Sequence, residues 1–574
     1  MEKKTTLNKE KNIHLKFQKN TKGITLIALV VTIIVLLILA GISISMLMGR
    51  NGILNRAAEA KKEHTIAQER EAIAIAYSSS MNVDNIGKVT GLELQDELDK
   101  IMENTEVTEN DTNLNILFKD TLHRYTISQD GTITKKDDLT PEEANKIVKI
   151  LSANMVLTAD GTVKYIDKKS LQAGDYTKLN TSDAKVITNN GIIKSGKGYF
   201  IDNKGKMFLI NPFYGSEYEG EGEEEEPCWD MAKNYDIFDG KKIIDYEESK
   251  WGTYLVLDSD GKIYSWGKNY DGQLGNGTNT NTSDPKCISD ISGSEIYGKK
   301  IKEIKISSAE FVTAIDDNGK VYTWGYNEYG ELGNGLKKNS NMPICISDLP
   351  NNILNGKKIE KIYPSGHNVF VLDNNGKLYT WGGYNYNGQL GNGTNTNTNT
   401  PICISDINES KLKGKKIVSM VTDSNASIAL DDNGKVYVWG ENSEGYLGIG
   451  NTENQMLPVC LNDLAGHIFS GKKIINIVEL QDGENIGFVA SDYEGNTYVW
   501  GINDQGQLGT GDNTNKQTPV MLNQIESSTF YNKKITQGYG CTFGGGVGYE
   551  ILCNYFLLDN GELYYKLYKI GLPV

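Results

Sequence analysis

The stretch WGKNYDGQLGNG, from Trp266 to Gly277, returns four more times in this chain of 574 residues. The copies begin at Trp324, Trp381, Trp439 and Trp500, so the unit recurs about every 58 residues, a period typical of repeat arrays and propellers. The repeat therefore predicts the architecture of the large C-terminal part of the chain.

A hairpin pattern precedes each copy, as in FVTAIDDNGKVYTWG from Phe311 to Gly325. An Asn-Gly turn between two β-forming runs predicts a tight two-stranded connection, because Asn and Gly tolerate positive φ. The turn glycines of the five clear copies are Gly261, Gly319, Gly376, Gly434 and Gly495. Weaker hairpins surround Gly161, Gly205 and Gly561, which brings the count to eight hairpins.

Two further short strands flank most of these hairpins, such as KKIKEIKIS on the upstream side and PICIS on the downstream side. Four short strands per repeat predict one blade of a β-propeller. We expect Trp266 to end the inner strand of its blade and to pack against the next blade. Gly267 would let two backbones approach closely, and Leu274 would turn inward.

The unit from Asp258 to Gly277 resembles the regulator of chromosome condensation repeat, and the resemblance covers residues 139–574. It implies a mainly β fold with a seven-bladed propeller, and a role as a protein-binding platform. The eight hairpins leave two alternatives. Either the hairpin at Gly161 closes a seven-bladed ring against the C-terminal blade, or the propeller has eight blades.

The N-terminal part has a different character, because the 25 residues from Ile24 to Met48 carry no charge. As a helix they would extend about 37 Å, enough to cross a hydrocarbon core of roughly 30 Å. The preceding residues 1–23 are rich in lysine, which favours a cytoplasmic N-terminus and an extracytoplasmic propeller. The sequence therefore predicts a single-pass protein of the bacterial cell membrane.

The junction KGITLIALV resembles the cleavage and methylation motif of type IV prepilins and pseudopilins. The resemblance implies that a prepilin peptidase cuts after Gly23 and leaves Ile24 as the new N-terminus. Ala28 stands where the family usually has Glu, so assembly into a filament is not expected; an uncleaved signal anchor is the alternative. We divide the chain into a leader (1–23), a transmembrane and amphipathic helix (24–81), a small α+β head (82–138) and the propeller (139–574).

Charge and composition argue against nucleic acid as a partner. The formal net charge is −15, and the arginines are confined to Arg50, Arg56, Arg70 and Arg124. A body that is acidic and lacks arginine offers neither the electrostatic attraction nor the bidentate groups that phosphates require.

Candidate sites in the sequence have plain structural readings. Four cysteines recur one repeat apart, which separates them by a blade and indicates small buried residues: Cys287, Cys345, Cys403 and Cys460. Cys541 and Cys553 could pair, although their spacing does not require it. The glutamate run from Glu217 to Glu226 indicates a solvated insertion rather than a calcium loop. We expect no catalytic, cofactor or metal site.

The predicted function is that of an extracytoplasmic propeller that binds a protein or a surface polymer, as a minor pilin-like subunit or adhesin. One alternative is an enzyme acting on surface glycans, which a pair of carboxylates near the central channel would favour. Another is a guanine-nucleotide exchange factor, which the predicted extracytoplasmic location opposes.

Overall fold

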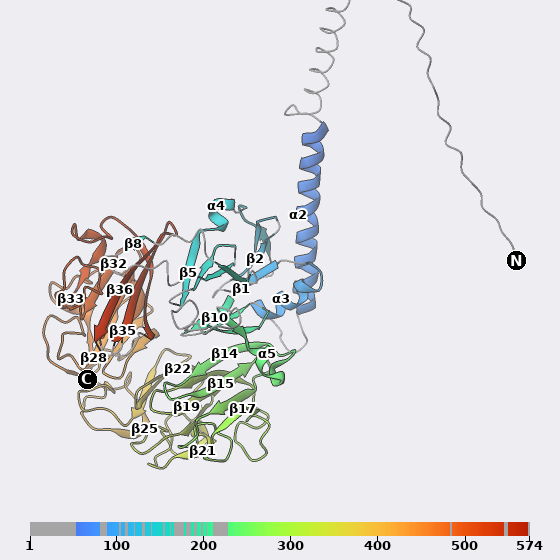
Figure 1. Ribbon diagram of the computed structural model, residues 1–574. Helices are drawn as coiled ribbons and strands as arrows, with labels where there is room; N and C mark the ends of the chain where they lie inside the picture. Colours follow the sequence, from blue (N-terminus) through green and yellow to red (C-terminus); the bar gives the residue numbers. More distant parts are fainter. Residues whose placement is uncertain are drawn as a thin grey trace, which may run out of the picture. The chain divides into compact units, whose positions relative to one another are not determined.

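The computed structural model describes residues 53–80, 89–102, 105–109, 113–119, 121–128, 132–138, 140–152, 155–160, 162–165, 177–178, 185–188, 192–196, 199–202, 204–210, 228–482, 485–544 and 549–571 (Figure 1). The chain divides into two compact units, residues 1–75 and 76–574. The predicted membrane segment, its cleavage site at Gly23 and Ile24, and the acidic run at 217–226 all lie outside the described residues. Among those that are described, no helix is long and apolar enough to cross a bilayer.

Helix α2 (Ile53–Ser80) forms the C-terminal part of the predicted N-terminal helix. A small α+β region follows within the predicted head. Helix α3 (Gly91–Asp99) packs beside a four-stranded antiparallel meander made of β1 (Thr105–Glu109), β2 (Asn113–Phe118), β3 (His123–Ser128) and β4 (Ile133–Lys135). Gln95 fastens the helix to the sheet by accepting a hydrogen bond from the backbone N–H of Val107 at 2.6 Å. Helix α4 (Pro141–Ala144), capped by Thr140, marks the start of the repeats.

Eight four-stranded antiparallel sheets make up the described part of the chain after α4. The first two are β5 (Ile147–Ser152), β6 (Met155–Thr158), β7 (Val163–Tyr165) and β9 (Lys185–Thr188), then β10 (Ile192–Gly196), β11 (Tyr199–Asp202), β12 (Met207–Ile210) and β13 (Cys228–Asp230). Short helices α5 (Met231–Asn234) and η2 (Asp236–Phe238) lead to the third sheet.

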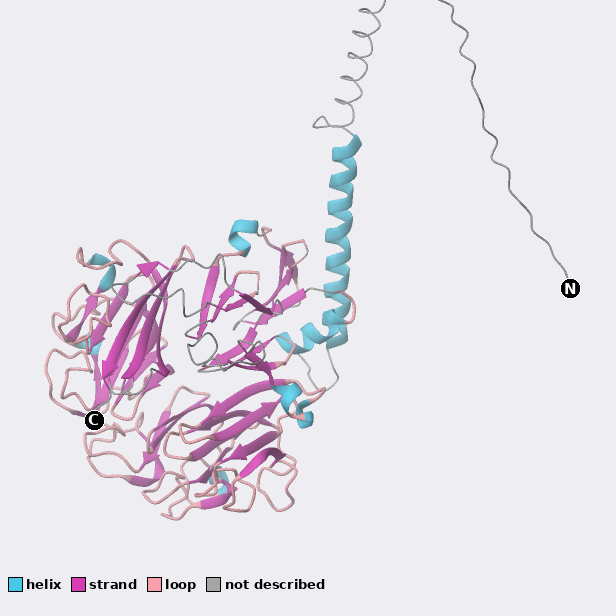
Figure 2. Cartoon of the chain, viewed as in Figure 1, coloured by secondary structure: helices cyan, strands magenta, loops and turns pink. Residues whose placement is uncertain are grey.

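The clear repeats form five sheets of the same pattern, which Figure 2 shows as strands joined by loops and short helical turns. Their strands are β14 (Ile243–Glu248), β15 (Thr253–Asp258), β16 (Ile263–Gly267), β17 (Thr282–Cys287); β18 (Ile301–Ile306), β19 (Phe311–Asp316), β20 (Val321–Gly325), β21 (Ser340–Cys345); β22 (Ile359–Ser365), β23 (Asn368–Asp373), β24 (Leu378–Gly382), β25 (Thr398–Cys403); β26 (Ile417–Thr422), β27 (Ala426–Asp431), β28 (Val436–Gly440), β29 (Gln455–Cys460); β30 (Ile474–Asp482), β31 (Asn485–Asp492), β32 (Thr497–Gly501) and β33 (Lys516–Met521). Three short helices follow β21, β29 and β33: η3 (Ile346–Asp348), η4 (Leu461–Asp463) and η5 (Leu522–Gln524).

The last sheet takes its strands from both ends of the repeat region. Strands β34 (Ile535–Gly544), β35 (Tyr549–Leu558) and β36 (Leu563–Gly571) are completed by β8 (Thr177–Lys178), which pairs with Tyr564 and Tyr565. The hairpin around position 161 does not join this sheet, because β6 and β7 form a sheet of their own with β5 and β9. The described strands after α4 therefore form eight sheets rather than seven.

The first strand of each sheet lies innermost, because first strands of successive sheets contact one another: β5 with β10, β10 with β14, and onward to β34, which contacts both β30 and β5. Our expectation that Trp266 ends the inner strand was wrong, since it lies in β16, the third strand of its sheet. The inner position belongs instead to the upstream KKIKEIKIS-type segment.

Four of the five repeat tryptophans bind the preceding sheet. The indole N–H of Trp324 donates to the carbonyl of Gln273 at 2.9 Å, and Trp381, Trp439 and Trp500 repeat this bond to Glu331, Gln389 and Tyr446. A Cβ added to Gly275 would lie 2.7 Å from the Trp324 indole nitrogen, which explains why the loop needs glycine there. Leu274 is fully buried, as predicted.

Candidate partner-binding face

The meander order places two kinds of loop at one end of every sheet. The turn between the first and second strands and the loop after the third strand emerge together, because antiparallel strands alternate in direction. Hydrogen bonds tie them: the N–H of Lys268 donates to the carbonyl of Gly252, and the N–H of Tyr326 to that of Glu310. We call this end the loop face. The other turns and the connections between sheets form the opposite face.

Buried asparagines give the long loops of this face a fixed shape. The side-chain amide of Asn269 donates to the carbonyls of Thr278 and Thr280 at 2.9 and 3.1 Å, while its oxygen accepts from the N–H of Leu274. Asn327, Asn385, Asn442 and Asn503 do the same in the next four repeats. Loops held in this way present their outer side chains in a set order.

Four large aromatic side chains stand exposed on the loop face of three successive sheets. We call them the aromatic patch: Trp251 is 63% exposed, Tyr270 67%, Tyr329 45% and Tyr386 62%. Trp251 lies in the turn after β14, and the tyrosines lie in the loops after β16, β20 and β24. Exposed tryptophan and tyrosine are the residue types that dominate the energetics of protein interfaces.

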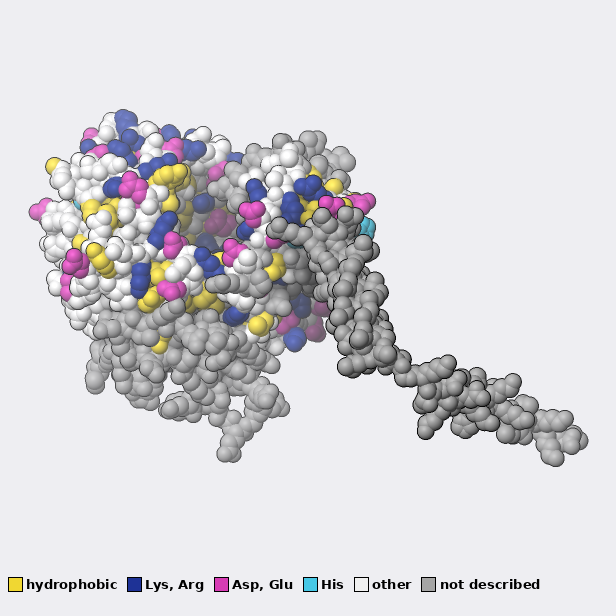
Figure 3. Space-filling model, turned by 90° about the horizontal axis from the view of Figure 1, so that it is seen from above, with side chains coloured by type: hydrophobic (Ala, Val, Ile, Leu, Met, Phe, Trp, Pro, Cys, Tyr) yellow, Lys and Arg dark blue, Asp and Glu magenta, His cyan; other side chains and the backbone are white. Residues whose placement is uncertain are grey.

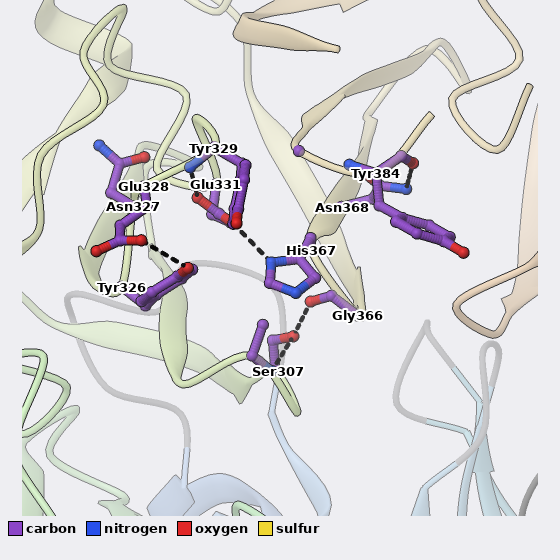
Figure 4. A network of polar contacts seen from close by, with 12 residues as sticks. Ser307, Tyr326, Asn327, Glu328, Tyr329, Glu331, Gly366, His367, Asn368 and Tyr384 are labelled. Atoms are coloured by element: carbon purple, nitrogen blue, oxygen red, sulfur yellow. Dashed lines mark hydrogen bonds and ion pairs between the residues drawn. The ribbon is translucent and has the colours of Figure 1, made fainter. Parts of the chain in front are cut away.

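A polar cluster built around His367 adjoins this patch (Figure 4). His367 lies in the turn after β22, and its Nδ1 is 2.7 Å from Oε1 of Glu331, whose side chain is fully buried. The other oxygen of Glu331 accepts the N–H of Tyr329 at 2.9 Å. With Nδ1 engaged by Glu331, Nε2 is the ring nitrogen left for a hydrogen bond to another group.

Aromatic rings flank the imidazole and continue into the next repeat. The rings of Tyr326 and Tyr329 have their centroids 5.8 and 5.6 Å from that of His367, both edge-on. Asn368 then holds the loop of the following repeat through two hydrogen bonds to the backbone of Tyr384, at 2.6 and 3.1 Å. Tyr326, Tyr329 and His367, which come from two sheets, thus form one cluster of rings, which we call the ridge.

The Glu331–His367 pair is one version of a contact between neighbouring sheets. One repeat earlier, Glu310 accepts hydrogen bonds from Thr253 at 2.7 Å and from Gln273 at 2.9 Å. Gln273 and Glu331 hold the same position in their loops, as do Glu310 and His367 in their turns. In the sequence, the only sign of the Glu331 contact was GELG in the second copy, where the other copies have GQLG or GYLG.

A family model described as RCC1-like domain matches residues 220–544. The chain belongs to the RCC1-like domain family. Among curated relatives, it is 29% identical over 273 residues to the E3 ubiquitin-protein ligase HERC2 of Mus musculus, which covers 47% of this chain and 5% of that protein. It is 26% identical over 272 residues to the ultraviolet-B receptor UVR8 of Arabidopsis thaliana, covering 47% of this chain and 56% of the receptor.

The RCC1-like chain therefore spans about half or less of the length of these relatives. Among solved structures it is similar to yeast RCC1 (Prp20) bound to Kap60, with a TM-score of 0.45, 16% identity, and coverage of 76% of this chain and 97% of that one. Human WBSCR16 gives a TM-score of 0.43 at 18% identity, covering 64% of this chain and 82% of the other.

The loop from Asn334 to Asn341, together with Asn279 of the preceding repeat, lines a hollow of about 700 Å³ on this RCC1-like propeller. Its wall joins two repeats through a hydrogen bond from Asn341 to Asn279 at 2.9 Å. Glu328 also lines the hollow and accepts a hydrogen bond from the hydroxyl of Tyr326 at 3.3 Å. The hollow and the ridge are therefore neighbours.

The opposite face of the RCC1-like propeller carries a row of ion pairs instead. Lys320 and Asp348 lie 2.7 Å apart, and the same pair recurs in three other sheets as Lys262–Asp290, Lys377–Asp406 and Lys435–Asp463. Half-exposed pairs of this kind contribute little to stability. The bond from Lys320 lowers the pKa of Asp348. Figure 3 shows basic and acidic side chains interspersed over the face that it presents.

The recurrent cysteines are free thiols; Cys345, Cys403 and Cys460 are buried, as predicted, whereas Cys287 is only partly buried. Burial raises the pKa of Cys345 to about 11, so the reactive thiolate is disfavoured.

Carboxylates near the central strands do have perturbed pKa values. Burial raises the pKa of Glu303 on β18 to about 7, and burial with the neighbouring Asp423 raises that of Glu479 on β30 to about 8. Asp423 already has a structural role, because it accepts the N–H groups of Asn425 and Ala426 at 2.9 and 2.6 Å. No cluster of three or more His, Cys, Asp or Glu side chains in the described ranges is arranged to hold a metal.

Proposed function

We propose that this chain is a membrane-anchored RCC1-like propeller of eight blades that binds a partner protein outside the cytoplasm, through the loop face of its third to fifth blades. The observation that carries the proposal is the aromatic patch. Its four side chains are between 45% and 67% exposed, and the three tyrosines lie on loops whose backbone is held by buried amides. Rigid aromatic anchors lose little conformational entropy on binding.

The Glu331–His367 pair and the hollow beside it extend this surface with polar groups. An interface needs hydrogen-bonding groups around its aromatic anchors, because these groups fix the orientation of the partner. Nε2 of His367 would form a hydrogen bond with the partner, and the amides lining the hollow would donate and accept others. A surface polymer rich in hydroxyl groups is the second ligand class that this chemistry fits.

Affinity capture with the full-length protein, extracted in detergent from its own cells, tests the proposal. The variant Trp251→Ala, Tyr270→Ala, Tyr329→Ala and Tyr386→Ala should lose a captured partner at least tenfold, since truncation of an interface anchor costs about 2 kcal/mol or more. The matched control removes aromatic side chains from the opposite face: Tyr297, which is 56% exposed, Tyr493, 78%, and Tyr531, 41%. Equal capture by both variants would place the binding surface elsewhere.

The proposed anchor rests on the apolar run from Ile24 to Met48 and on the resemblance of KGITLIALV to prepilin junctions. We propose that prepilin peptidase removes residues 1–23 and that Ile24 becomes a methylated N-terminus. Intact-mass measurement of the membrane-extracted protein tests this. Retention of Met1 to Gly23, in cells that process their other prepilins, would leave the uncleaved anchor as the explanation.

The full-length protein in its own cells also allows a test of the two alternatives, the guanine-nucleotide exchange factor and the enzyme acting on surface glycans. An exchange factor requires the propeller to be cytoplasmic, so protection of it from protease added to intact cells would favour that function. A glycan-acting enzyme would release reducing ends from cell-surface polysaccharide, and Glu479→Gln would abolish the release. We favour binding because Asp423, the neighbour of Glu479, is occupied in capping its own turn.

A further inference from the structure

Two cysteines lie opposite one another in the sheet that closes the propeller. Strands β34 and β35 pair in antiparallel register from Ile535 and Leu558 to Gly544 and Glu550, and Cys541 is the register partner of Cys553. Directly opposed residues of an antiparallel pair have their Cα atoms about 4.5 or 5.5 Å apart, and both project to the same side of the sheet. Both separations fall within the roughly 4.4 to 6.8 Å that disulfides span.

The other cysteines have a different relationship. The chain has seven, and the remaining five, which the structure shows as free thiols, are Cys228, Cys287, Cys345, Cys403 and Cys460. Cys287, Cys345, Cys403 and Cys460 are each the last paired residue in the fourth strand of a sheet, so they lie one repeat apart. Within the described strands, Cys541 has a cysteine as its register partner, whereas none of these five cysteines does.

The cysteine pair lies in the part of the closing sheet where a disulfide would hold β34 and β35 together. The described residues of β8, Thr177 and Lys178, pair with Tyr565 and Tyr564, whereas β34 has 10 residues and β18, the matching strand of a regular sheet, has six. Cys553 is itself opposite Leu567, two positions beyond the end of the β8 pairing. Cys541 and Cys553 therefore lie in the part of the hairpin beyond the described pairing of β8.

We propose that Cys541 and Cys553 form a disulfide that holds the first two strands of the closing sheet together. A thiolate of one cysteine attacks an acceptor disulfide, either of an oxidoreductase or of a small molecule such as oxidised glutathione, and displaces one thiol. The second cysteine then attacks the mixed disulfide and displaces the other thiol. Two protons and two electrons leave the protein, and the acceptor is reduced to two thiols. The proposal rests on strand register and not on the location of the propeller.

Alkylation and peptide mapping test the bond directly. Trypsin should release residues 535–566 as one peptide, which contains both cysteines and no internal Lys or Arg. The purified full-length protein is equilibrated with oxidised glutathione and alkylated with iodoacetamide before and after reduction. We expect this peptide to take up no label before reduction and two labels after it. The peptide 287–299, which contains Cys287 alone, should be labelled without reduction.

Thermal melting provides the second measurement. Dithiothreitol should lower the melting midpoint of the native protein and leave that of Cys541→Ser/Cys553→Ser unchanged, while Cys287→Ser should keep the sensitivity to dithiothreitol. Two labels on peptide 535–566 without reduction, or one glutathione on each cysteine, would overturn the proposal whatever the variants do on heating.

Discussion

At the scale of single residues, the repeat is a set of positions that only certain side chains fit. Gly319 has φ of +79°, as predicted from the Asn-Gly turn, but the turn alone does not explain its environment. A Cβ at this position would lie 2.6 Å from the backbone nitrogen of Ile359 in the following sheet. Glycine is therefore required at this position for two reasons: the positive φ of its backbone and the close approach of the next sheet.

Gly319→Val should lower the free energy of unfolding by about 1 to 3 kcal/mol from backbone strain, with a further loss from the clash with Ile359. Gly298→Val is the matched control, because Gly298 also has positive φ, +67°, yet an added Cβ meets nothing within 4 Å. Chemical denaturation of both variants measures the difference. Equal losses would mean that the close approach to the next sheet carries no energy.

At the scale of elements, the innermost strands hold protons that an unfolded chain would release at neutral pH. The pKa of Glu303 is raised from 4.5 to about 7, and that of Glu479 from 4.5 to about 8, mainly by burial. The folded state binds more protons than the unfolded state between these values. Stability from these groups is therefore complete below pH 4.5 and is lost as pH rises through 7 to 8.

We expect the free energy of unfolding to fall by about 2 to 4 kcal/mol between pH 5 and pH 8.5 for each of these carboxyls, before opposing groups are counted. Glu479→Gln should flatten that dependence, because a neutral amide has no proton to lose. Glu409→Gln, at an exposed loop position, is the control and should leave the slope unchanged. A native profile that rises over this range would contradict the burial argument.

Sequence patterns predicted the elements better than their relations. The turn glycines, the inward leucines and the four-strand unit are local signals, so they were found. The Glu331–His367 contact joins residues of different sheets, and no local period marks it. The number of sheets was left open between seven and eight for a similar reason. Strand β8 has two residues, too few for any pattern, so the hairpin before it was one of the two candidates for the closing element.

At the scale of the whole molecule, ring closure depends on that short strand. Thr177→Pro should remove a backbone donor from β8 and weaken its pairing with Tyr565. We expect a lower melting midpoint and concentration-dependent association through the uncovered edge of β36. Thr177→Val keeps the backbone donor and should behave as the native protein. Melting and light scattering report the two effects, and identical behaviour of the variants would show that β8 does not close the ring.

The predicted stalk gives a test of assembly. Ala28 replaces the glutamate that pairs with a neighbouring terminal amine in the prepilin family, and an unpaired ammonium is costly to bury among apolar helices. We expect the native protein to remain at the membrane or at a filament tip. Ala28→Glu should increase its share in sheared surface fractions, as seen by immunogold microscopy. Labelling of native filaments along their whole length would contradict this.

The two strands that close the propeller are made far apart in time. Strand β8 ends at Lys178, whereas its partner residues in β36 are Tyr564 and Tyr565. At about 5 to 20 residues per second, the ribosome needs roughly 20 to 80 s to travel between them. Throughout that interval the growing chain carries β8 while the three strands of its sheet have not yet been made. If the chain crosses the membrane during synthesis, the ring therefore reaches the far side before it can close. Any factor that protects the unpaired strand there must stay bound until the last residues arrive.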